Sequence, residues 1–153
     1  KIHLIKIVNI ICDMKNVLLL LFLLPVFCGS AQSTDESAIK QALQEQILAW
    51  NQGNLERFMK TYWENDSLMF IGKDGVKYGW HSTLNNYKRN YPDTVAMGKL
   101  SFTILKISQL SPEYFYVVGK WHLQRSIGDL NGHYDLLFRK INSRWVIVAD
   151  HSS

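Results

Sequence analysis

The sequence predicts an α+β domain, with N-terminal helices packed on one face of a curved antiparallel sheet. In its first part, apolar residues recur at the three- to four-residue spacing of amphipathic helices. In its last third, apolar and polar residues alternate in long segments separated by short turns, which is typical of an antiparallel meander. Helices that precede such a sheet bury their apolar stripes against one of its faces.

The start of the 153-residue sequence predicts export. Lys15, an apolar run over Val17–Phe27 and the small residues up to Ala31 together form a secretory signal. We therefore expect a signal peptide at residues 14–31, cleavage after Ala31, and a periplasmic or secreted bacterial protein. Residues 1–13 are interpreted as an upstream extension of the predicted gene.

The apolar run of this leader is shorter than the roughly 20 residues that span a bilayer. Lipidation at Cys28 is the alternative that would attach the protein to a membrane. Lipoprotein signals place a small residue before the cysteine, and Phe27 is bulky. We therefore expect no membrane association.

Removal of residues 1–31 changes the charge and the cysteine content. Three of the 17 basic residues and one of the 13 acidic residues lie there, so the net charge falls from +4 to about +2. Both cysteines, Cys12 and Cys28, leave as well. A Cys-free mature domain excludes a disulfide scaffold, a thiolate metal site and a cysteine nucleophile. Its balanced charge argues against nucleic acid as a partner.

Three helices are expected before the meander. Ser33 and Glu36 form a capping box for the first helix, and Gly53 suits the turn that follows it. Asn54 can cap a short second helix, and Pro92 ends the third. Their apolar stripes are Ile39, Ala42, Leu43, Ile47 and Trp50; then Leu55, Phe58, Met59 and Tyr62; then Trp80, Leu84, Tyr87 and Tyr91.

Six strands are expected, the first two of them joined by a turn at residues 72–75. They are Ser67–Ile71, Val76–Tyr78, Lys99–Gln109, Tyr114–Arg125, Gly132–Ile141 and Trp145–His151.

Strict alternation assigns the side chains of the last four strands to two faces. The core face would carry Phe102, Ile104, Val117, Trp121, Leu136, Phe138, Val146 and Val148. The outer face would mix Lys120, His122, Gln124, His133, Asp135, Arg139 and His151 with Leu137, Trp145 and Ile147. Large apolar groups on a polar face are typical of an interface, so we expect a homodimer through the outer sheet face.

Familiar catalytic motifs are absent from the sequence, and its histidines lack the spacing of metal ligands, so neither a metal nor a cofactor is expected. Polar residues on core-facing positions are more informative: Gln46, Tyr134 and Asp150. Aromatic side chains would surround them: Trp50, Tyr62, Trp80, Tyr87 and Trp121.

Two interpretations of this set are open. In the first, Asp150 and Trp80 hydrogen-bond to each other and fasten helix to sheet, because most buried polar groups form hydrogen bonds that serve only the structure. In the second, the set lines a concave ligand pocket that holds one carboxylate of raised pKa.

Several segments resemble the NTF2-like superfamily. Residues 49–56 (AWNQGNLE) and Tyr62-Trp63 are similar to its helix junction. Gly79-Trp80, residues 91–93, Met97-Gly98, residues 119–121 and the ending 145–153 resemble its SnoaL-like and DUF4440 branch. The resemblance covers residues 36–153. It implies a cone-shaped, cystatin-like α+β domain, usually dimeric, with a pocket between the helices and the concave sheet face.

Most functional residues of the known branches have no equivalent at the matching positions of this chain. The general-base aspartate of the ketosteroid isomerases would fall near Phe70 or Ile71, which are apolar, and their first-helix tyrosine would fall at about Gln46. The pocket arginines of the kinase association domains would fall at Trp121, Leu136 and Ser152. Neither the isomerase base nor that carboxylate site is therefore expected.

Three functions are compatible with the sequence. The first is an exported protein whose aromatic-lined pocket binds a small apolar or cyclic molecule. The second is an enzyme of the isomerase, cyclase or dehydratase type with Asp150 as acid or base. The third is a dimeric interaction module. Fold alone does not choose among them.

Overall fold

The computed structural model describes residues 30–153, of which residues 34–153 form a separate unit that contains the whole sheet. The expected gene extension, the signal peptide up to residue 29 and Cys28 lie outside the described residues. In the described part, no helix combines the length and the apolar character needed to cross a membrane.

The helices are α2 (Ser30–Asn51), α3 (Leu55–Met59), α4 (Trp80–Asn90) and α5 (Thr94–Met97). Because α2 begins at Ser30, Ser33 lies within it, and the expected capping box at Ser33 is wrong. The end of α2 follows the prediction, since Gly53 adopts a left-handed φ of 73° that favours glycine. The short helix α5 was not predicted from the sequence; Asp93 caps it by accepting a 2.8 Å hydrogen bond from the Ala96 amide.

The six strands form one sheet in the order β2-β1-β6-β5-β4-β3. Their bounds are β1 Met69–Gly72, β2 Gly75–Tyr78, β3 Lys99–Ser111, β4 Tyr114–Gln124, β5 Leu130–Ile141 and β6 Arg144–Ser152. The α+β class and the antiparallel meander of β3 to β6 are confirmed. The sheet as a whole is mixed, because β1 runs parallel to β6. No tight hairpin constrains that pair, so β1 can dock on the free edge of β6 in the parallel sense.

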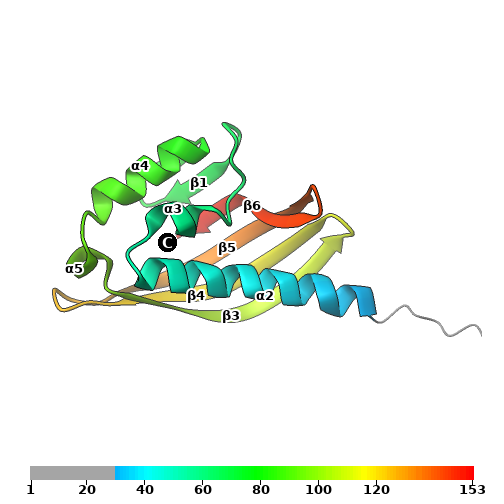
Figure 1. Cartoon of the computed structure of the whole chain (residues 1–153), viewed down its shortest axis with the longest axis horizontal. Helices are drawn as coiled ribbons and strands as arrows, with labels where there is room; N and C mark the ends of the chain where they lie inside the picture. Colours follow the sequence, from blue (N-terminus) through cyan, green and yellow to red (C-terminus); the bar gives the residue numbers. More distant parts are fainter. Residues whose placement is uncertain (1–29) are drawn as a thin grey trace, which may run out of the picture. The chain divides into compact units, whose positions relative to one another are not determined.

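One face of the meander is covered by α2, which runs along it in Figure 1. The stripe residues Ile39 and Leu43 of α2 are buried together with Phe115 and Phe138 of the sheet. Asp35 fastens the start of this helix, because its Oδ1 accepts from Lys140 Nζ at 2.8 Å and from Trp145 Nε1 at 3.0 Å.

A β-bulge at Val148 places side chains of β6 on the opposite faces from those predicted. Ile147 pairs with Phe138 and Ala149 pairs with Leu137, so Val148 is an extra residue that reverses the alternation. Trp145 and Ile147 therefore face the core, which contradicts their predicted place on the outer face. The same bulge returns Asp150 to the core face, opposite Leu136.

Candidate functional site

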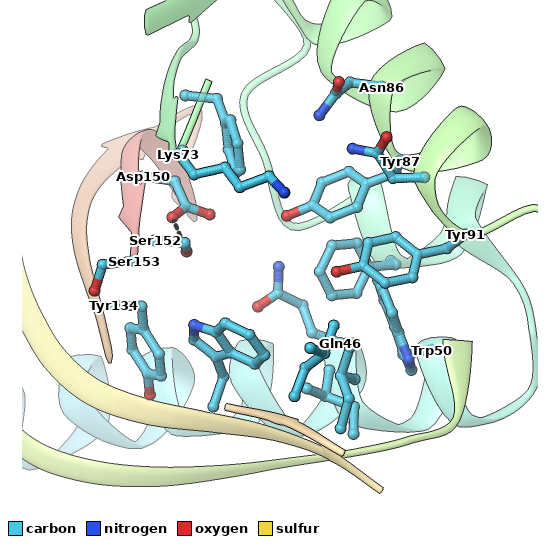
Figure 2. Close-up of a pocket in the computed structure, with 18 of the residues that line it drawn as sticks. Gln46, Trp50, Lys73, Asn86, Tyr87, Tyr91, Tyr134, Asp150, Ser152 and Ser153 are labelled. Atoms are coloured by element: carbon cyan, nitrogen blue, oxygen red, sulfur yellow. Dashed lines mark hydrogen bonds between the residues drawn. The ribbon is translucent and has the colours of Figure 1, made fainter. Parts of the chain in front are cut away.

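A cavity of about 390 Å³ lies between the helices and the core face of the sheet. Figure 2 shows side chains from the helices and from the sheet converging on it. Its volume falls within the range typical of small-molecule sites. Nine of the 24 residues in its wall are aromatic: Trp50, Phe58, Tyr62, Phe70, Tyr87, Tyr91, Phe102, Trp121 and Tyr134.

The structure places seven of the eight candidate site residues in this wall: Gln46, Trp50, Tyr62, Tyr87, Trp121, Tyr134 and Asp150. Trp80 does not line the cavity, and its Nε1 donates to the carbonyl of Met59 at 2.9 Å. The expected pair of Asp150 and Trp80 is therefore wrong. On α4, Trp80 belongs to the first turn and fastens this helix to α3, whereas Tyr87 lies two turns further on.

Sequence reasoning missed other wall residues, among them Phe58, Tyr91 and Lys73. Phe58 and Tyr91 belonged to predicted apolar stripes, so their periodicity marked them as buried but not as cavity-lining. Lys73 lies in the turn between β1 and β2, where sequence gives no indication of which elements the turn approaches.

Asp150 is held inside the cavity wall by two hydrogen bonds. Its Oδ2 accepts from Tyr62 Oη at 2.6 Å, and its Oδ1 accepts from Ser152 Oγ at 2.8 Å (Figure 2 draws the second). The side chain is only 3% exposed. Burial raises the pKa of Asp150 to about 6, although both hydrogen bonds favour the ionised form. The carboxyl group therefore titrates close to neutral pH.

Tyr62 and Tyr87 extend this network into the aromatic wall. Burial, and then the nearby Asp150 charge, raises the pKa of both phenols well above its usual range. A hydrogen bond with Tyr62 partly opposes this rise at Tyr87. Both hydroxyl groups stay protonated at physiological pH, so they can donate to Asp150, to each other or to a ligand.

Three buried polar atoms of the wall have no hydrogen-bond partner: Gln46 Nε2, Trp121 Nε1 and Tyr134 Oη. Gln46 is only 1% exposed, and Figure 2 shows its amide directed into the cavity. An unsatisfied buried donor costs about 1–3 kcal/mol. A ligand with an acceptor atom beside the Gln46 amide would supply the partner that this donor lacks within the protein.

Two glycines let aromatic rings lie against the sheet. In the ladder between β4 and β5, Gly119 pairs with Tyr134, and Trp121 pairs with Gly132. A Cβ at Gly119 would collide with the ring and hydroxyl of Tyr134, and one at Gly132 would meet the backbone carbonyl of Ser153 before Trp121 Cζ2. Gly119 therefore lets the Tyr134 ring lie against β4, while Gly132 makes room for the Ser153 backbone as well as for Trp121.

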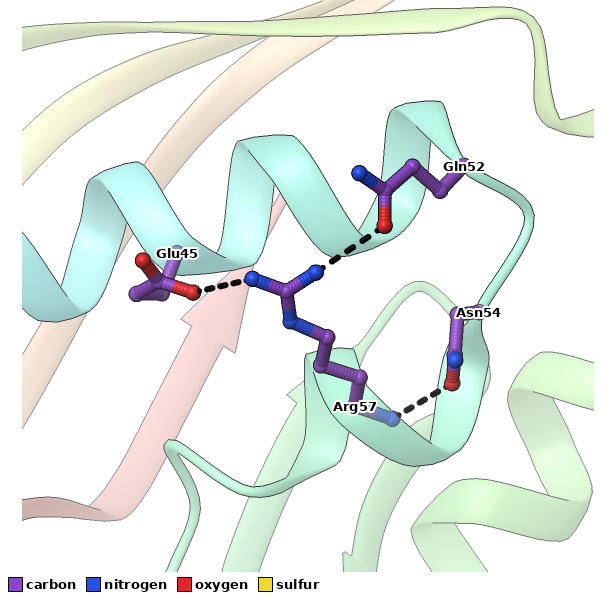
Figure 3. Close-up of polar contacts among 4 residues, drawn as sticks. All are labelled: Glu45, Gln52, Asn54 and Arg57. Atoms are coloured by element: carbon purple, nitrogen blue, oxygen red, sulfur yellow. Dashed lines mark hydrogen bonds and ion pairs between the residues drawn. The ribbon is translucent and has the colours of Figure 1, made fainter.

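Polar contacts between the helices fix the cavity wall beside Phe58. The guanidinium of Arg57 donates to Glu45 Oε2 at 2.6 Å and to Gln52 Oε1 at 2.9 Å (Figure 3). The Arg57 amide donates to Asn54 Oδ1 at 2.8 Å, which caps α3. The bond to Glu45 joins α3 to α2, and the ring of Phe58 packs edge-on against Trp50 with 5.2 Å between the ring centroids.

Charged side chains at the exposed end of the cavity come from the β1–β2 hairpin. Lys77 Nζ donates to Asn86 Oδ1 at 3.2 Å and lies 3.7 Å from Asp74 Oδ2. Lys73 is exposed, and Figure 2 shows its amine directed into the same central space as the Gln46 amide. Across residues 30–153, no three His, Cys, Asp or Glu side chains form a group that could hold a metal ion.

Known proteins that resemble this chain indicate its family, but their names give no activity for it. No protein-family model matches the chain, and no curated protein matches it. Among solved structures, an NTF-2 like protein of unknown function from Shewanella oneidensis is 44% identical, with a TM-score of 0.75. That match covers 78% of this chain and 98% of the other.

Two further solved structures share the fold at lower identity. An NTF2-like superfamily protein from Salmonella enterica is 18% identical over 80% of this chain and 92% of its own, with a TM-score of 0.63. A ketosteroid isomerase-like protein from Erwinia carotovora atroseptica is 16% identical over 76% and 93%, with a TM-score of 0.60. The extent and identity of the Shewanella match show that this chain belongs to the NTF2-like family.

Proposed function

We propose that this protein binds a small apolar or cyclic molecule in the cavity between its helices and its sheet. The observation that carries the proposal is an aromatic-walled space of about 390 Å³ into which the unpartnered amide of Gln46 is directed (Figure 2). Such a cavity leaves aromatic surface accessible to water, and a ring compound that covers this surface gains about 25 cal/mol for each Å² removed from water. An oxygen atom on the ring compound can also accept a hydrogen bond from the Gln46 amide.

Titration with ring compounds tests this proposal directly. Trp50 and Trp121 line the cavity, so a bound ring changes their fluorescence. Binding also raises the melting temperature, which keeps rising with the logarithm of the ligand concentration above the Kd. A panel of neutral bicyclic and tricyclic alcohols and ketones is expected to give a saturable change in fluorescence and a concentration-dependent rise in the melting temperature.

A matched pair of variants on α4 controls for surface binding. Asn90 is exposed and lines the cavity, whereas Asn85 is exposed and does not line it. Asn90→Phe is expected to narrow the entrance and weaken binding, while Asn85→Phe leaves it unchanged. Equal affinity in both variants, or no saturable response from the native protein, would contradict a ligand site in this cavity.

A second candidate function is supported by Asp150. A carboxyl group whose pKa is raised to about 6 by burial can exchange a proton near neutral pH. Tyr62, which donates to it at 2.6 Å, supplies a neutral acid beside it. We propose an isomerase, cyclase or dehydratase type of reaction as this alternative. Turnover that is lost in Asp150→Asn, with ligand affinity retained, would favour it over binding alone.

Other properties predicted from the sequence stay predictions. We propose export through the signal peptide at residues 14–31, membership of the SnoaL-like or DUF4440 branch, and a homodimer. The dimer is supported by half-buried Tyr116, Val118 and Leu137 on the outer face of β4 and β5. Analytical ultracentrifugation tests it, and a monomer at micromolar concentration would contradict it.

A further inference from the structure

Asp150 is a buried carboxylate without a positively charged partner. Its two hydrogen bonds come from the hydroxyl groups of Tyr62 and Ser152, both of which are neutral. Across residues 30–153 it forms no ion pair with a lysine, an arginine or a histidine. A buried charge is costly unless an opposite charge pairs with it. The counter-ion of this carboxylate is therefore missing from the described part of the chain.

The strands around Asp150 do not supply that counter-ion. In the sheet, Asp150 pairs with apolar Phe70 of β1 on one side and with apolar Leu136 of β5 on the other. His151 and Asp135 lie on the outer face, 2.9 Å apart, and their charges act on Asp150 in opposite directions. A compensating cation must therefore reach the carboxyl group from the cavity.

The carboxyl group of Asp150 is open to a ligand on that side. Asp150 lines the cavity, and Figure 2 shows its carboxyl group directed into the central space that the Gln46 amide also faces. An ionised carboxyl group can accept about four hydrogen bonds, and this one accepts two. An ammonium group in the cavity therefore finds an open acceptor, and hydrogen bonds between two charged groups are the strong ones.

Lys73 is the other charged group directed into this space, and solvent weakens its effect. Its side chain is exposed in the turn between β1 and β2. Water and salt screen an exposed charge far more than a buried one. The second lysine at this end, Lys77, lies 3.7 Å from the carboxylate of Asp74. The buried charge of Asp150 therefore dominates the inner part of the cavity.

We propose that the cavity selects a cyclic amine, whose ammonium group pairs with the Asp150 carboxylate while the aromatic wall holds its ring. The inference rests on the proposed binding function and names the class of ligand. The faces of the aromatic rings favour the same choice, because they attract cations. A cyclic carboxylate is disfavoured, since it would bring a second negative charge to Asp150.

Three naphthalene compounds with the same ring system test this selection. They are 2-naphthylmethylammonium, 2-naphthylmethanol and naphthalene-2-carboxylate, titrated calorimetrically into the native protein at pH 7.5. We expect the ammonium compound to bind about tenfold more tightly than the alcohol, as one charge-assisted hydrogen bond allows. The carboxylate should bind most weakly.

A matched pair of variants locates the preference. Asp150→Asn keeps the shape of the side chain and removes its charge, so the ammonium compound and the alcohol should bind within about twofold of each other. The affinity for the alcohol should stay within about twofold of that of the native protein. Asp135→Asn removes the same charge from the outer face, beside His151, and should leave the preference unchanged. Melting temperatures verify that each variant is folded.

The outcomes separate this inference from the proposed function. Equal affinity for the ammonium compound and the alcohol, or tightest binding of the carboxylate, overturns the selection of an amine while leaving a ring-binding cavity in place. A preference that persists in Asp150→Asn has the same meaning. If that variant does not fold, the order of the three compounds in the native protein decides by itself. Failure of all three compounds to bind overturns both proposals.

Discussion

Asp150→Asn should make the protein more stable at neutral pH, although it removes a buried hydrogen-bonded carboxylate. Burial raises the pKa of Asp150 to about 6 from an ordinary value of 3.8. A raised pKa means that the folded state binds the proton more tightly than the unfolded state does. The stability from this group is therefore fully present below pH 3.8 and is lost as the pH rises through 6.

The size of the effect follows from the difference between these pKa values. About two units at 1.36 kcal/mol each cost the ionised protein about 3 kcal/mol at pH 7.5, and less than about 1 kcal/mol at pH 4. Asparagine carries no charge and keeps a hydrogen bond to Tyr62 or Ser152, whose hydroxyl groups can donate or accept. We expect the variant to gain about 3 kcal/mol in the free energy of unfolding at pH 7.5.

Urea unfolding at pH 4 and pH 7.5 measures this gain. Asp135→Asn is the matched control, because that carboxylate lies on the outer face beside His151 and should change stability by less than about 0.5 kcal/mol. If the Asp150 variant shifts the free energy of unfolding equally at both pH values, or is the less stable protein at pH 7.5, the assignment of a buried, raised-pKa carboxyl group is refuted.

Three further substitutions test the cavity wall by urea unfolding and by ligand titration. Gln46→Met removes an unpartnered buried donor at similar volume, so it should raise the free energy of unfolding by about 1 kcal/mol; a loss of stability would mean that the amide has a structural partner. Gly119→Ala places a methyl group against the Tyr134 ring and should cost about 1–3 kcal/mol. The double variant with Tyr134→Leu should recover part of that loss, and additive losses would argue against the contact. Trp80→Phe removes the bond to the Met59 carbonyl and should cost about 1 kcal/mol. It should leave ligand affinity unchanged, whereas weaker binding would place Trp80 at the site after all.

The local sequence was sufficient for α3, for α4, for the end of α2 and for the meander. Periodicity identified α3 and α4, and Gly53 and Pro92 marked where α2 and α4 end. These features depend on the near neighbours of each residue, which sequence displays directly. The same reasoning misplaced the start of α2 and missed α5, a helix of four residues that is too short to show a period.

The candidate site was predictable in its composition but not in its contacts. The aromatic residues and Asp150 were recognisable because they are polar or bulky groups on core-facing positions. The role of Trp80 was not, since its indole turns to the Met59 carbonyl rather than to the sheet. Lys73 was not predicted for a related reason. It lies in a turn, and it lines the cavity only because the fold brings this turn close to elements that are distant in the sequence.

The sequence by itself determined an α+β domain with a helical first part, a meander and an aromatic-rich core. Only the tertiary structure decided what surrounds Asp150. The bulge at Val148 is a one-residue shift in the pairing of β5 with β6. In addition, β1 pairs in parallel with β6, although the two strands are far apart in the sequence. Such pairings depend on contacts between strands, which alternation along one strand does not encode. Together with the parallel bridge between Tyr62 and Ile147, they bring Tyr62, Ser152 and Asp150 together at the wall of a cavity.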